Sequence, residues 1–246
     1  MMKNKLMTAF LLSLTLLQGM FSAGVATGVV GGDEGGSSSE PVAVGTPVNF
    51  EFTVVNGASS VQFEVYDSHG NRVYYTSPMA VSEEGTVSWS WSPPFADTFT
   101  VWAVSDGAER QQVMLVTAYQ PDASGFVTGG GWLELEGARQ NFGFVAQVQR
   151  NGSLRGSLEY QDHGWRLNLK SFVIDWVYVP NPSEGYFSGR ATLNGSGDYR
   201  FWVALWDGGT PGTSDLFMIW VYDSGNNLVY SAWGTLAGGN LVVHVR

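Results

Sequence analysis

The chain has 246 residues, a formal net charge of −10 at pH 7 and no cysteine. This length suffices for one large domain or two of ordinary size. The lack of cysteine excludes disulfides, thiolate catalysis and cysteine-bound metals. The acidity argues against nucleic acid and anionic lipid as partners, because a negatively charged protein repels both. Ten Trp, ten Tyr and fourteen Phe provide the buried surface that a chain without disulfides needs.

Residues 1–26 have the composition of a signal peptide. Two lysines make the start positive, an apolar run follows at Leu6–Leu17, and small residues end the segment. The apolar run is shorter than the roughly 18–20 residues of a membrane-spanning helix, which favours cleavage over a membrane anchor. We therefore expect a secreted protein, extracellular or at the cell surface, with no membrane span. Cleavage is expected after Ala26, with Ala23 as the alternative.

Residues 27–41 (TGVVGGDEGGSSSEP) are rich in glycine, serine and acidic residues. Too few apolar groups are present for packing, so the segment is predicted to be a flexible linker or tail. An alternative is that Ala23–Val44 leaves its own domain and completes the sheet of a neighbouring copy by strand addition. Its apolar anchors would be Val29-Val30 and Val42–Val44.

Residues 42–119 alternate between apolar and polar side chains, the pattern of strands with one buried face. The alternation is clear in Val48–Thr53 and Val61–Tyr66 and recurs up to Thr117. Asp67–Asn71 has the Asp, Gly and Asn of a hairpin turn. About seven strands in roughly 80 residues favour an immunoglobulin-like β-sandwich. This half resembles bacterial immunoglobulin-like and fibronectin-type modules, a resemblance of architecture that identifies no ligand.

A turn-rich joint at residues 120–125 precedes the second unit, residues 126–246. This unit also consists of predicted strands, and no segment has a helical stripe. The predicted strands are Phe142–Gln149, Ser157–Tyr160, Leu167–Val179, Tyr186–Leu193, Tyr199–Trp206, Leu216–Tyr222, Leu228–Ala232 and Asn240–Val245. Turn dipeptides such as Asn151-Gly152 separate them. The sequence therefore predicts an all-β chain of two tandem sandwiches, the second of them jelly-roll-like.

Several motifs of the second unit occur in a recognisable order. They are TGGGW at Thr128–Trp132, NFGF at Asn141–Phe144, LEYQDH at Leu158–His163, NGSG at Asn194–Gly197 and a closing strand at Gly238–His244. In this order they resemble the post-COAP type of extracellular bacterial module, over about half of the chain. The connection Leu133–Gln140 is shorter than is usual in that family. The resemblance implies an extracellular, non-catalytic module and transfers no catalytic residue.

Acidic residues in two loops of the second unit are candidates for a calcium site. Calcium takes oxygen ligands from carboxylates, amides and carbonyls. Asp207 and Asp215 enclose a glycine-containing loop, and Asp223 lies in a nearby hairpin. Ordinary turn chemistry explains the same residues and is favoured, so no cofactor is expected apart from this calcium alternative.

Two tryptophans are candidates for carbohydrate binding. Trp202 and Trp206 share one face of their predicted strand, and the other face is apolar. Either the neighbouring domain covers these rings, which is favoured, or they are open and stack on sugars.

An active site is not indicated. The three histidines lie far apart in the sequence without metal-ligand spacing, and there is no nucleophile motif for Asp162-His163 to activate. We therefore expect a secreted, non-enzymatic protein that binds through β-sheet surfaces or has a structural role. The expected partners are an extracellular protein or polysaccharide, with self-association as a further possibility. The alternatives are a filament subunit assembled by strand addition and a carbohydrate-binding module.

Overall fold

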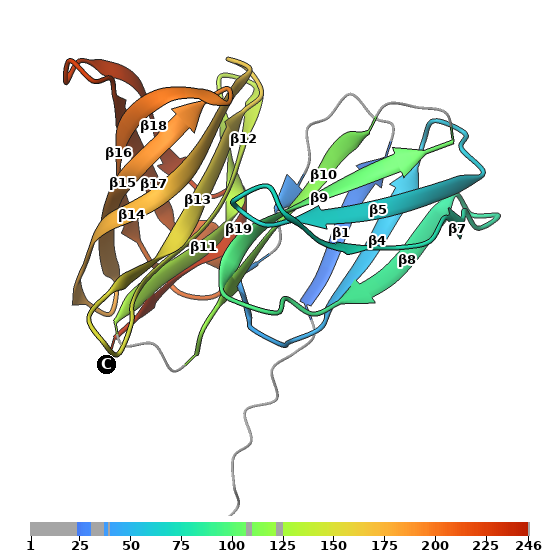
Figure 1. Cartoon of the computed structure of the whole chain (residues 1–246), viewed down its shortest axis with the longest axis horizontal. Helices are drawn as coiled ribbons and strands as arrows, with labels where there is room; N and C mark the ends of the chain where they lie inside the picture. Colours follow the sequence, from blue (N-terminus) through green and yellow to red (C-terminus); the bar gives the residue numbers. More distant parts are fainter. Residues whose placement is uncertain (1–23, 31–36, 39, 107–109, 122–124, 246) are drawn as a thin grey trace, which may run out of the picture.

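The computed structural model describes residues 24–30, 37–38, 40–106, 110–121 and 125–245. Most of the predicted signal peptide, residues 1–23, lies outside the described residues. The described part consists of strands and one 3-10 helix, η1 (Gly212–Ser214), so the all-β prediction is confirmed. Within this part no helix has the length and hydropathy that a bilayer crossing requires. Two units lie side by side in Figure 1.

The first unit has two sheets that enclose its core. One sheet orders β1 (Gly24–Val30), β4 (Val48–Val54) and β8 (Thr86–Trp91). The other orders β2 (Ser37–Ser38), β10 (Gln111–Tyr119), β9 (Asp97–Ser105), β5 (Ser60–Tyr66) and β6 (Arg72–Tyr75). The short strands β3 (Val42–Ala43) and β7 (Met79–Ala80) pair with β10 and β5.

The predicted alternation is what builds this core. Along β4 every second residue is buried, and Phe52 packs its ring 4.9 Å from that of Phe63 on the opposite sheet. Trp89 of β8 stacks at 4.2 Å on Phe50 and at 5.5 Å on Phe63. Aromatic burial of this kind stabilises the unit in place of disulfides.

The N-terminal part of the first unit differs from the expectation of a flexible linker. Residues 24–30 form β1, which pairs in parallel register with β4, and Ala26 and Val30 are buried against the core. The cleavage position expected after Ala26 therefore lies inside a strand. Residues 24–30 join the sheet because their small and apolar side chains fit the edge of β4. The Gly, Ser and acidic residues that dominate the rest of segment 27–41 had favoured the linker prediction.

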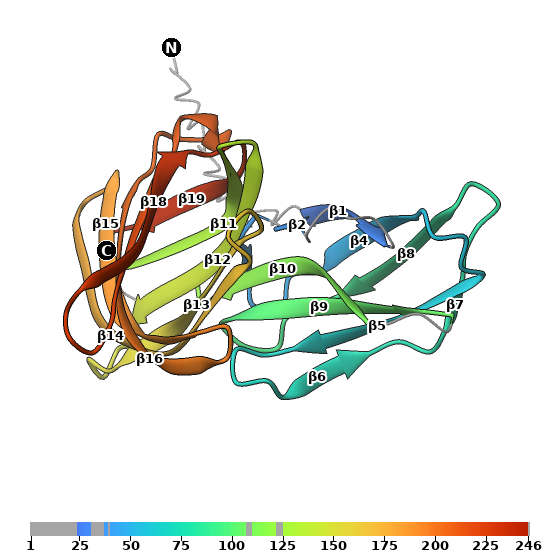
Figure 2. The ribbon, with the colours of Figure 1, turned by 90° about the horizontal axis from the view of Figure 1, so that it is seen from above.

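The second unit is a single nine-stranded sheet. Its strands are β11 (Phe126–Leu135), β12 (Ala138–Val148), β13 (Leu154–Asp162), β14 (Leu167–Asn181), β15 (Glu184–Leu193), β16 (Ser196–Trp206), β17 (Leu216–Tyr222), β18 (Leu228–Thr235) and β19 (Gly238–His244). From β11 to β18 each strand pairs with the next, and β19 returns to pair with β11. The sheet curls into a half-barrel (Figure 2).

This order corrects the jelly-roll prediction. A jelly roll needs long connections between strands that are not consecutive. Here the turns are short, as at Gln149–Ser153, where two backbone hydrogen bonds of 2.8 and 2.9 Å close a hairpin. Consecutive strands therefore pair directly, and the sheet becomes a meander.

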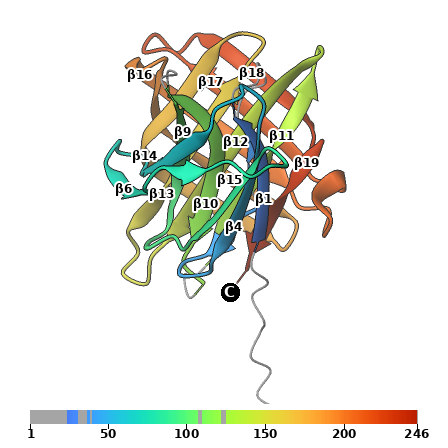
Figure 3. The ribbon, with the colours of Figure 1, turned by 90° about the vertical axis from the view of Figure 1, so that its right-hand side faces the viewer.

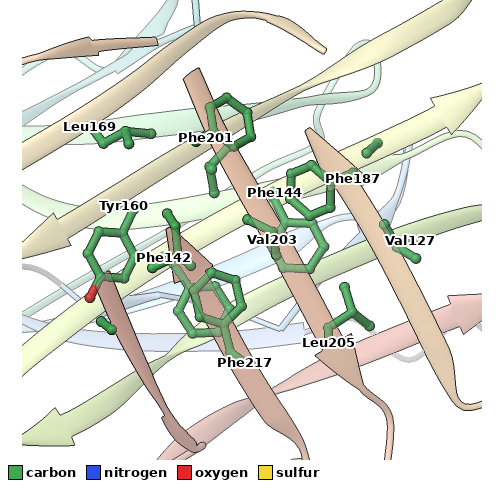
Figure 4. Close-up of a cluster of buried hydrophobic side chains, with 14 of the residues drawn as sticks. Val127, Phe142, Phe144, Tyr160, Leu169, Phe187, Phe201, Val203, Leu205 and Phe217 are labelled. Atoms are coloured by element: carbon green, nitrogen blue, oxygen red, sulfur yellow. The ribbon is translucent and has the colours of Figure 1, made fainter. Parts of the chain in front are cut away.

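Strand β11 lies outside the strands predicted for this unit, because its glycines disfavour strands by propensity. The structure shows why one of these glycines, Gly129, is needed. A Cβ at Gly129 would lie 2.4 Å from the Phe144 ring, so the glycine makes room for that ring. Phe144 belongs to the aromatic core inside the curl, with Phe142, Phe187 and Phe217 (Figure 4).

The two units pack together through β9 and β10 of the first and β12 and β13 of the second (Figure 2). The backbone N–H of Thr98 donates to Ser157 Oγ at 2.7 Å, and Gln147 Nε2 donates to the carbonyl of Gln120 at 3.2 Å. Gly143 allows the close approach, since a Cβ there would meet Thr117 Oγ1 at 2.6 Å. Figure 3 looks along the molecule with the first unit in front of the curled sheet.

Candidate functional site

The outer face of the curled sheet carries exposed aromatic rings. On β16 the side chains alternate, with Phe201 and Val203 in the core and Trp202 and Trp206 on the outside. Trp202 is 39% exposed and Trp206 is 46% exposed. The predicted shared face of the two tryptophans is therefore present in the structure.

Rings from two other strands extend this surface around Trp202. Trp176 of β14 lies 5.4 Å from Trp202 and 5.9 Å from Tyr178, which in turn stacks at 6.2 Å on Tyr186 of β15. We name these four residues, Trp176, Tyr178, Tyr186 and Trp202, the aromatic platform. Trp206 lies on the same face, four residues further along β16.

The backbone explains why rings from strands that are not adjacent meet here. Ser188 of β15 lies opposite both Trp176 and Trp202 in the ladder, and its small side chain leaves room for the two rings to touch. Its hydroxyl donates to Asp175 at 2.6 Å. A β-bulge between Ile174 and Trp176 interrupts the alternation of β14 and turns the Trp176 ring outward. Because of the bulge, strict period-two alternation along β14 would place Trp176 on the same face as the buried Ile174, so the sequence pattern does not predict its exposure.

The first unit does not cover this face. Its strands contact β11, β12 and β13, whereas the platform lies on β14, β15 and β16. The favoured expectation that the neighbouring domain covers Trp202 and Trp206 is therefore wrong. The units instead meet where Gly143 permits close approach and where Tyr119 packs on Phe126.

The structure does not bring together the three aspartates that were considered for calcium. Asp215 is fully buried, and its carboxylate accepts the N–H of Leu241 at 2.7 Å. Burial raises the pKa of Asp215. Asp207 accepts the N–H of Val243 at 3.0 Å, and Asp223 closes its own hairpin through hydrogen bonds to Asn227. These carboxylates fix loops and the edge of β19, as turn chemistry predicts.

A different acidic group lies in the first unit. Ligand atoms of Asp67, His69 and Asp97 lie within 4.8 Å of one another, the one such group of three found among the residues that the structure describes. Both carboxylates already hold the turn: Asp67 accepts the N–H of Asn71 at 2.7 Å, and Asp97 accepts the hydroxyl of Ser68 at 2.9 Å. The group therefore stabilises a hairpin.

The other two histidines have structural surroundings. His163 lies 2.9 Å from the Asn141 side-chain amide, and burial lowers its pKa. His244 stacks on Phe126 with ring centroids 3.8 Å apart, and burial lowers its pKa to about 4. His163 is placed by a hydrogen bond and His244 by ring stacking.

Sequence comparisons assign no relationship. No protein-family model matches the chain, and no curated protein matches it.

Proposed function

We propose that this chain is a secreted, non-catalytic binding protein of the cell surface or extracellular space. In this proposal residues before β1 act as the export signal, the first unit is an immunoglobulin-like sandwich, and the curled second unit is a module of the post-COAP type. The curled sheet then presents a ligand-binding face, and the first unit acts as a spacer and support.

The ligand that this proposal assigns to the aromatic platform is a carbohydrate polymer. The observation that carries it is one contiguous group of rings on the outer face, in which Trp176, Tyr178 and Trp202 are exposed and Tyr186 is half-buried. Aromatic faces stack on the apolar faces of sugar rings while tyrosine hydroxyls and indole N–H groups reach sugar oxygens. Exposed aromatic surface of this kind is a marker of binding sites.

Affinity electrophoresis in gels containing soluble β-glucan, xylan or glycol chitin tests this assignment. We expect at least one polysaccharide to retard the protein, and each of Trp176→Ala and Trp202→Ala to weaken retardation by about two- to tenfold. The control is Phe172→Ala, which removes another ring that is half exposed on the same strand, outside the platform. Equal retardation of all variants, or none of the wild type, contradicts the assignment.

A second candidate function is assembly into filaments by strand addition. It is favoured by the position of β1, which lies at a sheet edge and buries Ala26 and Val30 against β4. The same strand from another copy would make the same contacts. Electron microscopy of the full chain at high concentration should show filaments, which Val30→Asp weakens and Thr27→Asp, at an exposed position, does not. Monomers at every concentration contradict assembly.

A further inference from the structure

A groove of about 970 Å³ lies where the curled sheet fails to close. One wall is the whole of β18. The other side is formed by the tip of the β11–β12 hairpin, near Glu136, and by the turn after β13, with Trp165. At one end β18 meets the rest of the sheet, where Ala237 donates its N–H to the carbonyl of Trp132 at 2.9 Å. The groove therefore runs along the whole of β18.

Strand β18 has a free edge in this groove. Its ladder in the described part of the chain is with β17 alone. In an antiparallel pair, every second residue directs its N–H and C=O away from the partner strand. Strand β18 therefore presents a row of backbone donors and acceptors that an added strand can use.

The floor of the groove carries hydrogen-bond acceptors held in place by a buried network. The Tyr230 hydroxyl donates to Asp162 Oδ2 at 2.6 Å, so the Tyr160 hydroxyl, 2.8 Å away, donates to Tyr230. The other carboxylate oxygen of Asp162 accepts the N–H of Trp165 at 2.9 Å. Gln140 lines the same floor and is 2% exposed, and its Oε1 has no hydrogen-bond partner among the described residues.

The charged side chains that line the groove are all acidic. The groove contains the carboxylates of Glu136 and Asp162, and none of its lining residues, all of which are described, is a lysine, arginine or histidine. The rings of Trp165 and Trp233 at its border are 72% and 68% exposed. Carboxylates, an unpartnered amide oxygen and open aromatic faces all suit a positively charged donor.

We propose that this groove binds an extended segment of a partner protein that pairs with β18 and places a lysine or arginine side chain over Gln140 and Asp162. A polypeptide is favoured over a sugar because it satisfies both features at once: its backbone pairs with the free edge, and its cation meets the acceptors. This site is separate from the aromatic platform, which lies on the outer face of β14–β16. It adds a protein partner to the proposed polysaccharide ligand, and neither proposal requires the other.

Fluorescence anisotropy with synthetic peptides tests the proposal on the full chain. The probe is a labelled peptide of eight residues, the length of β18, in which threonine and lysine alternate. The first comparison replaces each lysine by glutamine. The second keeps every lysine but methylates the backbone nitrogens of alternate residues, in two peptides that cover the odd and the even positions. Methylation removes donors to a strand edge without changing the charge.

We expect the lysine peptide to bind about tenfold more tightly than the glutamine peptide. One of the two methylated peptides should lose binding and the other retain it, because only one register directs its donors at β18. Equal binding of all the cationic peptides would show simple attraction to an acidic protein and overturn the proposal. Binding of cellohexaose or chitohexaose in place of the peptides, with a change in Trp fluorescence that Trp165→Ala removes, would also overturn it.

Protein variants locate the site. Glu136→Gln removes one groove carboxylate at an exposed turn and should weaken the lysine peptide several-fold. Glu134→Gln removes an exposed carboxylate of the same hairpin that does not line the groove, and should leave binding unchanged. Gln140→Leu replaces the unpartnered oxygen by an apolar group and should weaken the lysine peptide but not the glutamine peptide, with Tm recorded for each variant. Equal effects of Glu136→Gln and Glu134→Gln contradict this placement.

Discussion

At the residue scale, the second unit contains a buried hydrogen-bond network of Tyr160, Tyr230 and Asp162. Burial raises the pKa of both Tyr160 and Tyr230, so both hydroxyls stay protonated and act as donors. Each has a partner, and the chain of donors ends on the Asp162 carboxylate. A satisfied network of this kind holds the neighbouring strands in one arrangement.

Tyr230→Phe tests the contribution of this network. The change leaves Tyr160 without its acceptor and Asp162 without one donor, while ring packing is kept. We expect the free energy of unfolding to fall by about 1–3 kcal/mol, measured by urea titration. Tyr178→Phe removes a hydroxyl at a site that is 53% exposed and should have little effect. Equal losses in the two variants would show that the network contributes nothing specific.

His244 makes stability depend on pH in one direction. Its folded-state pKa of about 4 lies below the ordinary 6.5, so between these values the unfolded chain binds more protons. The free energy of unfolding contributed by His244 is therefore present above pH 6.5 and is lost as the pH falls towards 4. His244→Phe keeps a ring against Phe126 and should flatten this part of the stability curve. An unchanged curve would rule out His244 as the cause.

Glu159 gives the stability of the fold the opposite pH dependence to that of His244. It is 3% exposed at the contact between the units, and burial raises its pKa although Lys170 lies 3.8 Å away. The folded chain therefore binds more protons above pH 4.5 than the unfolded chain, and stability falls as the pH rises through this window. Glu159→Gln should raise Tm at pH 7 and leave it unchanged at low pH, as followed by calorimetry. A lower Tm at pH 7 would mean that the Lys170 ion pair outweighs desolvation.

At the element scale, sequence patterns predict strands well where one face is buried. Strands β4 and β5 follow the alternation closely, because one face of each packs on the core and the other is more open. Strands β9 and β10 have long buried runs instead, because their second face packs against the second unit. The same reasoning fails at β1 and β11, where small residues and glycines fill the buried positions for reasons of close packing. It also misses Trp176, since a bulge shifts that ring to the outside. Of the four platform residues the sequence indicated only Trp202, together with Trp206 beside the platform. Trp176, Tyr178 and Tyr186 join Trp202 only through the packing of β14, β15 and β16, and the groove likewise depends on the fold.

The position of β1 leads to a prediction about processing. Cleavage after Ala26 would remove the start of β1, including the buried Ala26 side chain, whereas cleavage after Ala23 leaves the strand whole. We therefore expect the intact mass of the secreted protein to correspond to a chain that begins at Gly24. A mass that begins at Thr27 would show that the shortened strand suffices or that β1 forms differently.

At the scale of the whole molecule, the contact between the units is closely fitted around Gly143. A Cβ at this position would lie 2.6 Å from Thr117 Oγ1 and 3.0 Å from Thr98 Cγ2. Gly143→Val should therefore separate the units, with a larger radius in small-angle scattering and two melting steps in place of one. Gly234→Ala, where the nearest atom to the new Cβ is a leucine methyl at 3.4 Å, is the matched control. An unchanged radius for Gly143→Val would mean that the contact adapts.

The sequential strand order of the second unit has a consequence for how the chain gains its shape. From β11 to β18 every new strand finds its neighbour in the segment just synthesised, so loop closure costs little at each step. Long-range pairing occurs in both units: β2 and β3 pair with β10, which follows them by more than sixty residues, and β19 returns to pair with β11. We therefore expect the second unit to zip up hairpin by hairpin from β11 to β18 and to gain the pairing of β19 with β11 last, as its slow step.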